Sequence, residues 1–133
     1  MPGTAGRLLL VEPQFVMRRT VSTMAREMGL ADVQEATSAA MAQKMLGERR
    51  YDAMLVSLDD DGESLQLLQR LRAGEVAQPA DLPVAATAMS CDVALAMQLK
   101  QLDISRLLLK PFKVRGMLEV ISALGAPAPL PPH

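Results

Sequence analysis

Short runs of apolar residues alternate along the chain with segments of helical periodicity. RLLLV at residues 7–11 has the length of a buried strand, and the segment after it places apolar side chains three or four positions apart until Gly29. This strand-then-helix pattern occurs five times. The predicted strands are residues 7–11, 31–36, 51–57, 83–89 and 106–109.

Each predicted helix carries apolar side chains at spacings that place them on one face. In chain order, these residues are Met17, Val21, Met24 and Met28; Met41, Met45 and Leu46; Leu65, Leu68 and Leu71; Leu95, Leu99 and Leu102; and Met117, Val120, Ile121 and Leu124. Thr37 or Ser38 can cap the second helix. Strands that are apolar on both faces, each followed by a helix, predict an α/β fold with a parallel sheet covered on both sides.

In an open parallel sheet, binding sites form outside the carboxyl ends of the strands. The chemistry-bearing residues at these predicted ends are Glu12 and Pro13, Ser57 with Asp59, Asp60 and Asp61, Thr87 and Ala88, and Lys110. A site built from these residues would combine carboxylates, hydroxyls and one lysine.

The composition limits the classes of function. A chain of 133 residues predicts one domain, which we place at residues 1–124, followed by a proline-rich tail or linker at 125–133. The net charge of −1 gives no overall attraction to nucleic acid or to an anionic membrane. Cys91 is the only cysteine, and no apolar run approaches the roughly 20 residues of a membrane span, so we expect a cytoplasmic protein without an internal disulfide.

Three motifs resemble the receiver domain of bacterial two-component response regulators, over roughly residues 7–124. They are LLLVEPQFVMRR at the first strand and helix, YDAMLVS at the third strand, and LLLKPF at the fifth. The resemblance implies a CheY-like, flavodoxin-type fold, with a five-stranded parallel sheet in the order 2-1-3-4-5 and five helices on both faces. It also implies a role in two-component or phosphorelay signalling.

The resemblance further implies a phosphoryl-transfer site. In the family, an aspartate at the tip of the third strand accepts a phosphoryl group from a histidine kinase, and an acidic pair after the first strand helps to hold Mg²⁺. A lysine before proline, a hydroxyl on the fourth strand and an aromatic switch residue on the fifth complete it. Carried over to this sequence, only the lysine is kept, as Lys110.

The other positions depart from the family pattern. Ser57 stands at the acceptor position, Glu12 and Pro13 replace the acidic pair, and Leu107 occupies the switch position. The hydroxyl position falls on Ala88 in an alignment without a gap, which we favour, or on Thr87 if the strand has lost one residue. We therefore interpret the chain as a degenerate receiver, or pseudo-receiver, and not as an enzyme.

Ser57 would need a neighbouring base to act as a nucleophile, and the only histidine, His133, lies in the tail. We interpret Ser57 as a small polar residue that fills the acceptor position. Glu12 with Asp59, Asp60 and Asp61 could collect a divalent cation, but three acids before a glycine are also typical of a solvated turn. We expect no cofactor, with Mg²⁺ at these residues as the alternative.

Lys110 needs a partner if it is buried, because an unpaired buried charge is unstable by several kcal/mol. Glu12 is the obvious candidate, and this pair would keep the pocket neutral without phosphate or metal. The alternative is that Lys110 extends its ammonium group into water. The first alternative predicts a receiver that is fixed in one conformation.

These observations favour a function in binding. We expect a phosphorylation-independent module that binds a signalling protein, such as a histidine kinase or another receiver, with a homodimer as a further possibility. The candidate contact residues are Met17, Arg18 and Arg19 on the first helix, and Met97, Gln101, Arg106, Leu107 and Met117 on the face of the fourth helix, fifth strand and fifth helix. One alternative is a true phosphoacceptor at residues 59–61. The other is a module that binds a nucleotide second messenger through Arg18 and Arg19 or Arg49 and Arg50.

Overall fold

The sheet predicted from the sequence is present in the computed structural model, which describes residues 6–104 and 106–125. Its strands are β1 (Arg7–Val11), β2 (Asp32–Ala36), β3 (Ala53–Ser57), β4 (Val84–Ala88) and β5 (Arg106–Leu109). They are all parallel and lie in the order β2-β1-β3-β4-β5. The helices are α1 (Phe15–Glu27), α2 (Ala39–Leu46), α3 (Glu63–Arg72), α4 (Val93–Gln101) and α5 (Val114–Gly125). The predicted fold class is confirmed.

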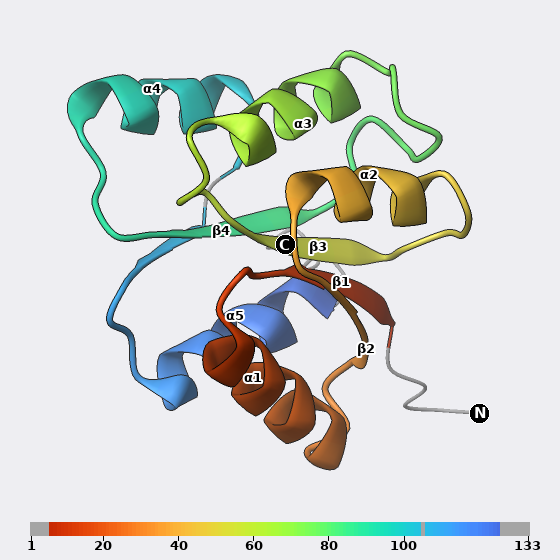
Figure 1. The fold of residues 1–133 in the computed structure, drawn as a ribbon, viewed down its shortest axis with the longest axis vertical. Helices are drawn as coiled ribbons and strands as arrows, with labels where there is room; N and C mark the ends of the chain where they lie inside the picture. The colour runs from red at the N-terminus through yellow and green to blue at the C-terminus, as the bar shows by residue number, and fades with distance from the viewer. Residues whose placement is uncertain (1–5, 105, 126–133) are drawn as a thin grey trace, which may run out of the picture.

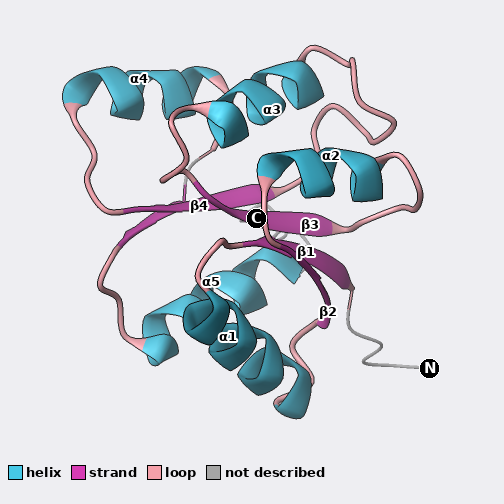
Figure 2. Cartoon of the chain, viewed as in Figure 1, coloured by secondary structure: helices cyan, strands magenta, loops and turns pink. Residues whose placement is uncertain are grey.

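The helices form two layers around the sheet. Helices α1 and α5 cover one face, and α2, α3 and α4 cover the other (Figures 1 and 2). Successive residues of a strand point to opposite faces, so Leu8 and Leu10 pack toward α1 and α5, whereas Leu9 and Val11 pack on the other side. Every residue of β3 and β4 is buried, which explains why these segments read as continuous apolar runs.

In helix α2, the predicted N-cap is correct and one residue of the predicted buried face is wrong. Ser38 is its N-cap, since the hydroxyl oxygen accepts a hydrogen bond from the Met41 backbone N–H at 3.1 Å. The buried face consists of Ala39, Ala42 and Leu46. Met41 was predicted on this face, but it is 42% exposed because its sulfur lies outside, beside Thr37. The small alanines face the sheet instead.

The end of the chain is described only in part. Helix α5 includes Gly125, which we had assigned to the proline-rich tail. Residues 126–133, including His133, lie outside the described residues, so the domain boundary stays a prediction. Within the described residues, none of the helices has both the length and the apolar character needed to span a membrane.

Tyr51, just before β3, is a titratable side chain in the core. Its side chain is buried and its hydroxyl has no hydrogen-bond partner among the described residues. Burial raises the pKa of Tyr51 above its ordinary value of 10.0, although Arg49 and Arg7 act in the opposite direction. The folded protein thus keeps this proton at a pH where the unfolded chain begins to lose it.

We expect the free energy of unfolding to decrease as the pH rises above about 10, because the unfolded state then binds fewer protons than the folded state. Urea denaturation across this range would measure the effect. Tyr51 is the only tyrosine and there is no tryptophan, so ultraviolet absorbance follows its ionisation directly. Tyr51→Phe is the control and should remove this contribution. Ionisation of Tyr51 at its ordinary pKa in the folded protein would contradict the expectation.

Candidate functional site

Three of the residues predicted at the carboxyl ends of the strands, Glu12, Ser57 and Lys110, meet in one buried pocket. Glu12 extends β1, with its backbone N–H donating to the Ala36 carbonyl at 3.0 Å, and Ser57 is the last residue of β3. Lys110 follows β5 and donates its backbone N–H to the Ala88 carbonyl at 2.8 Å. The sheet therefore brings together side chains from distant parts of the sequence.

The ammonium group of Lys110 is at the centre of this pocket. Its Nζ lies 2.8 Å from Glu12 Oε1 and 3.2 Å from Asp59 Oδ2, and it donates a hydrogen bond to Ser57 Oγ at 3.2 Å. The predicted pair of Lys110 with Glu12 is confirmed. The alternative, an ammonium group in water, is wrong, because the Lys110 side chain is only 9% exposed.

Asp59 is a second partner of Lys110 that sequence reasoning missed. Its Oδ1 accepts a hydrogen bond from the Met89 backbone N–H at 3.0 Å, while Oδ2 contacts Lys110. Asp59 thus links the ends of β3, β4 and β5. Its position two residues after Ser57 was an available signal, since residues at this spacing along an extended chain share a face.

The three consecutive acids have three different environments. Asp60 accepts hydrogen bonds from the backbone N–H of Ser64 at 3.1 Å and from the Ser64 hydroxyl, so it caps the start of α3. Asp61 is exposed, and it forms a turn with Gly62 in which both residues have left-handed backbone (φ 56° and 87°). Only Asp59 contributes to the pocket.

Mg²⁺ is the ion that the family resemblance implies here, but the donor set does not fit it. Glu12 Oε1 is paired with Lys110, and Oε2 accepts a hydrogen bond from the Gln14 backbone N–H at 3.0 Å. Pro13 supplies no carboxylate, and the Lys110 ammonium contacts both Glu12 and Asp59. Among the described residues, no group of three histidine, cysteine, aspartate or glutamate side chains is arranged to hold a metal ion.

The surroundings of Ser57 are those of a structural hydroxyl. Ser57 Oγ accepts hydrogen bonds from Lys110 Nζ and from the Asp59 backbone N–H at 3.4 Å. An ammonium group that donates a hydrogen bond cannot remove the proton that a nucleophilic serine must lose. His133, the other candidate base, lies outside the described residues.

The hydroxyl beside Ser57 belongs to Thr87. These two residues are partners in the parallel register of β3 and β4, so their side chains are on the same face of the sheet. Thr87 lines a small cavity of about 10 Å³ together with Glu12 and Phe112. Ala88, the next residue, faces the opposite side. The gap-free alignment that favoured Ala88 therefore does not match the register of the sheet.

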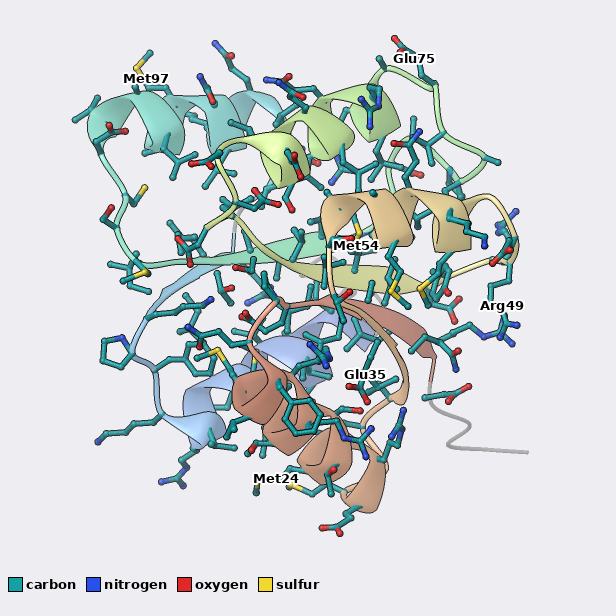
Figure 3. The ribbon with its side chains drawn as sticks, in the orientation of Figure 1. Met24, Glu35, Arg49, Met54, Glu75 and Met97 are labelled. Atoms are coloured by element: carbon teal, nitrogen blue, oxygen red, sulfur yellow. The ribbon has the colours of Figure 1, made fainter. Side chains whose placement is uncertain are left out.

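Arg18 supports the pocket from α1, although it was predicted as a partner contact. It is buried, and its Nη1 donates to the Glu12 carbonyl at 2.9 Å and to the Pro13 carbonyl at 3.4 Å. Its Nε lies 3.1 Å from Glu35 Oε1 on β2, and Figure 3 shows Glu35 between β2 and α1. Arg18 therefore holds the β1–α1 connection and is not free to contact a partner.

Two of the other predicted contact residues differ sharply in exposure. Met117 is 2% exposed and packs in the core between α5 and the sheet, so it is not part of the surface. Met97 is 58% exposed and projects outward from α4 (Figure 3). Of the others, Arg19, Gln101 and Arg106 are exposed, and Met17 and Leu107 are half-buried.

The two arginine pairs proposed for a nucleotide ligand lie at opposite edges of the sheet. Arg18 and Arg19 are in the first half of α1, near the carboxyl ends of the strands. Arg49 and Arg50 precede β3, near the amino ends. Since Arg18 is also buried against Glu35, the two pairs do not form one ligand site.

Comparisons with known proteins agree with the fold. Solved structures similar to this chain include a response regulator receiver protein from Pseudomonas putida, which is 24% identical with a TM-score of 0.79, covering 90% of this chain and 97% of that one. The non-phosphorylated HemR receiver domain from Leptospira biflexa is 20% identical, with a TM-score of 0.78 and coverage of 96% and 98%. The chemotaxis protein CheY4 from Vibrio cholerae is 15% identical, with a TM-score of 0.76 and coverage of 90% and 98%.

None of the curated proteins matches the chain. The family model described as "Response regulator receiver domain" matches residues 8–122, which is most of the sequence. The matched segment runs from β1 into α5 and contains every residue of the pocket. The chain therefore belongs to the response regulator receiver domains, the signalling modules of two-component systems that work with histidine kinases.

Proposed function

We propose that this receiver domain acts without phosphorylation, by binding a signalling protein and changing that protein's activity through occupancy. The observation that carries the proposal is the set of contacts that the Lys110 ammonium group makes. Its ammonium group contacts the carboxylates of Glu12 and Asp59 and the hydroxyl of Ser57, the residue that we assign to the acceptor position. A carboxylate is already ionised when it accepts a phosphoryl group, whereas a serine hydroxyl requires a base.

The face formed by α4 and β5 supports a role in protein binding. Leu99 is the only buried residue of α4, and Val93 and Met97 are strongly exposed on the same helix. Arg106, on the neighbouring edge strand β5, is also exposed. Methionine and arginine are enriched in protein interfaces. The partner that we propose for this face is a histidine kinase or another receiver.

The test is the intact mass of the purified protein after incubation with Mg²⁺ and acetyl phosphate. We expect wild type to gain no phosphoryl mass. Ser57→Asp restores the acceptor carboxylate, and Ser57→Asp with Pro13→Asp also restores the second acid, so the double variant is the positive control. Phosphorylation of wild type under conditions in which the double variant is also phosphorylated would contradict the proposal.

A second candidate function is phosphoacceptance by Asp59. The observation that favours it is the position of Asp59 Oδ2, 3.2 Å from Lys110 Nζ, with the side chain 27% exposed. Asp60 and Asp61 lack this contact, since one caps α3 and the other faces solvent. If wild type gains phosphoryl mass and Asp59→Asn does not, Asp59 is the acceptor and the chain is a phosphorelay component.

A further inference from the structure

A groove on the outer surface between α1 and α5 is separate from the Lys110 pocket. The two helices lie side by side on one face of the sheet (Figure 1), and the groove between them has a volume of about 410 Å³. Its apolar lining consists of Met24, Met28, Leu30, Val114 and Leu118. Leu118 is buried, whereas Met28 is 58% exposed. Exposed apolar surface of this kind is typical of a site that another segment or molecule covers.

The charges of the lining indicate what kind of occupant fits. The groove contains one cation and one anion, Arg115 and Glu119, which are both exposed and one helical turn apart on α5. The lining therefore has no net charge, and it offers no overall attraction to an acidic or a basic partner. The occupant that fits best is apolar and uncharged.

Residues 126–133, which lie outside the described residues, have this chemistry. Their sequence is APAPLPPH, with four prolines and Leu130 and without Asp, Glu, Lys or Arg. Proline has no backbone N–H, so half of these residues can lie against an apolar lining without leaving a donor unpaired. A proline-rich chain also loses little conformational entropy when it binds in an extended form.

The segment also starts close to the groove. It follows directly after α5, which ends at Gly125 and contributes part of the lining. Eight residues in the polyproline II conformation span about 25 Å, whereas the 12 residues of α5 span about 18 Å. A chain that turns back after Gly125 is therefore long enough to follow the whole groove. The covalent connection gives it an effective concentration on the order of millimolar, which favours it over a separate molecule.

We propose that residues 126–133 turn back after α5 and occupy the groove between α1 and α5 of the same chain. Leu130 packs near the middle of the groove, beside Met28 and Leu118, and the prolines cover the rest of the apolar lining. The segment is then an intramolecular strap that closes this groove to other apolar partners. The strap involves neither the Lys110 pocket nor the face of α4 and β5, so its failure in an experiment would leave the proposed function untouched.

NMR of the methionine methyl groups in the full chain tests the strap, because Met24 and Met28 line the groove. Leu130→Asp places a charge against the apolar lining, so the methyl resonances of both residues should shift. Met97 is the matched control, since it has the same exposed fraction as Met28 but lies on α4. Its resonance should stay in place. The inference is overturned if Met24 and Met28 shift no more than Met97 does.

Leu130→Met is a second variant, which keeps the segment apolar and adds an eleventh methionine methyl group. We expect a nuclear Overhauser effect between this methyl group and that of Met24 or Met28, and its absence for both residues would overturn the inference. Circular dichroism would show that both variants keep the fold. The wild-type resonances of Met24 and Met28 should not change on dilution, because the segment and the groove belong to one molecule. A change on dilution would assign the groove to a second copy and would overturn the strap.

Discussion

Replacement of Lys110 by methionine is expected to lower the free energy of unfolding by about 3 to 5 kcal/mol. The substitution keeps the length and apolar stem of the side chain but removes the charge between Glu12 and Asp59. Glu12 is buried, so its carboxylate would lose its cation without gaining water in exchange. Urea denaturation of wild type and variant measures the difference. The slope of the free energy of unfolding against urea concentration should be the same for both proteins.

The matched control is the double variant Glu12→Gln with Lys110→Met. It removes both charges of the closest pair, and we expect it to be more stable than Lys110→Met alone, because the uncompensated buried carboxylate is the main cause of the loss. If the free energy of unfolding of Lys110→Met lies within about 1 kcal/mol of the wild-type value, the stability of the protein does not depend on this ion pair. Such small effects are common for exposed pairs.

Arg18→Met is expected to be the second most damaging of the substitutions considered, with a loss of about 2 to 3 kcal/mol in the free energy of unfolding. The guanidinium group donates to the carbonyls of Glu12 and Pro13 and pairs with Glu35. Its removal leaves the buried Glu12 carbonyl without this donor, and methionine fills only part of the space. Urea denaturation again provides the measurement.

Arg19→Met is the control for Arg18→Met, because the neighbouring arginine contacts the same carboxylate. Arg19 Nη1 lies 2.9 Å from Glu35 Oε2, but the Arg19 side chain is 51% exposed. We expect a loss below about 1 kcal/mol, as for other exposed ion pairs. Equal losses for the two variants would show that the contacts of Arg18 with the β1–α1 connection add nothing to stability.

The fold was predictable because hydrophobic periodicity directly reflects burial. Residues 7–11 and 106–109 were predicted as strands with the bounds that the structure has, and β3 and β4 are each trimmed only at their ends. Parallel strands buried on both faces appear as short apolar runs, which distinguishes them from the longer amphipathic helices. The helix faces were predicted less well, since Met28 and Met41 are as apolar as the buried positions but lie outside the core.

Only one contact of the pocket, the ion pair of Lys110 with Glu12, was predicted from the sequence. Lys110 and Glu12 could be matched because few charged residues follow the strands. Asp59 was not separated from Asp60 and Asp61, although its spacing from Ser57 was a signal, because three consecutive acids have the same chemistry and differ only in their contacts: Asp59 with Lys110, Asp60 with Ser64, and Asp61 with solvent. Arg18 was misassigned because the sequence does not distinguish two adjacent arginines. Both contact Glu35, but only Arg18 is buried and donates to the Glu12 and Pro13 carbonyls.

The pocket joins residues that are far apart in the sequence, which has a consequence for the order in which the protein is assembled. Lys110 follows the last strand, whereas Ser57 lies 53 positions earlier and Glu12 is at the end of the first strand. Contacts of such long separation form late, after the loops between them have closed. Until β5 has been made, Glu12 and Asp59 lack the Lys110 ammonium group that joins them in the native state. Arrival of β5 both completes the sheet and brings one ammonium group to the two carboxylates, so closure of the native state is tied to the last strand of the domain to be made.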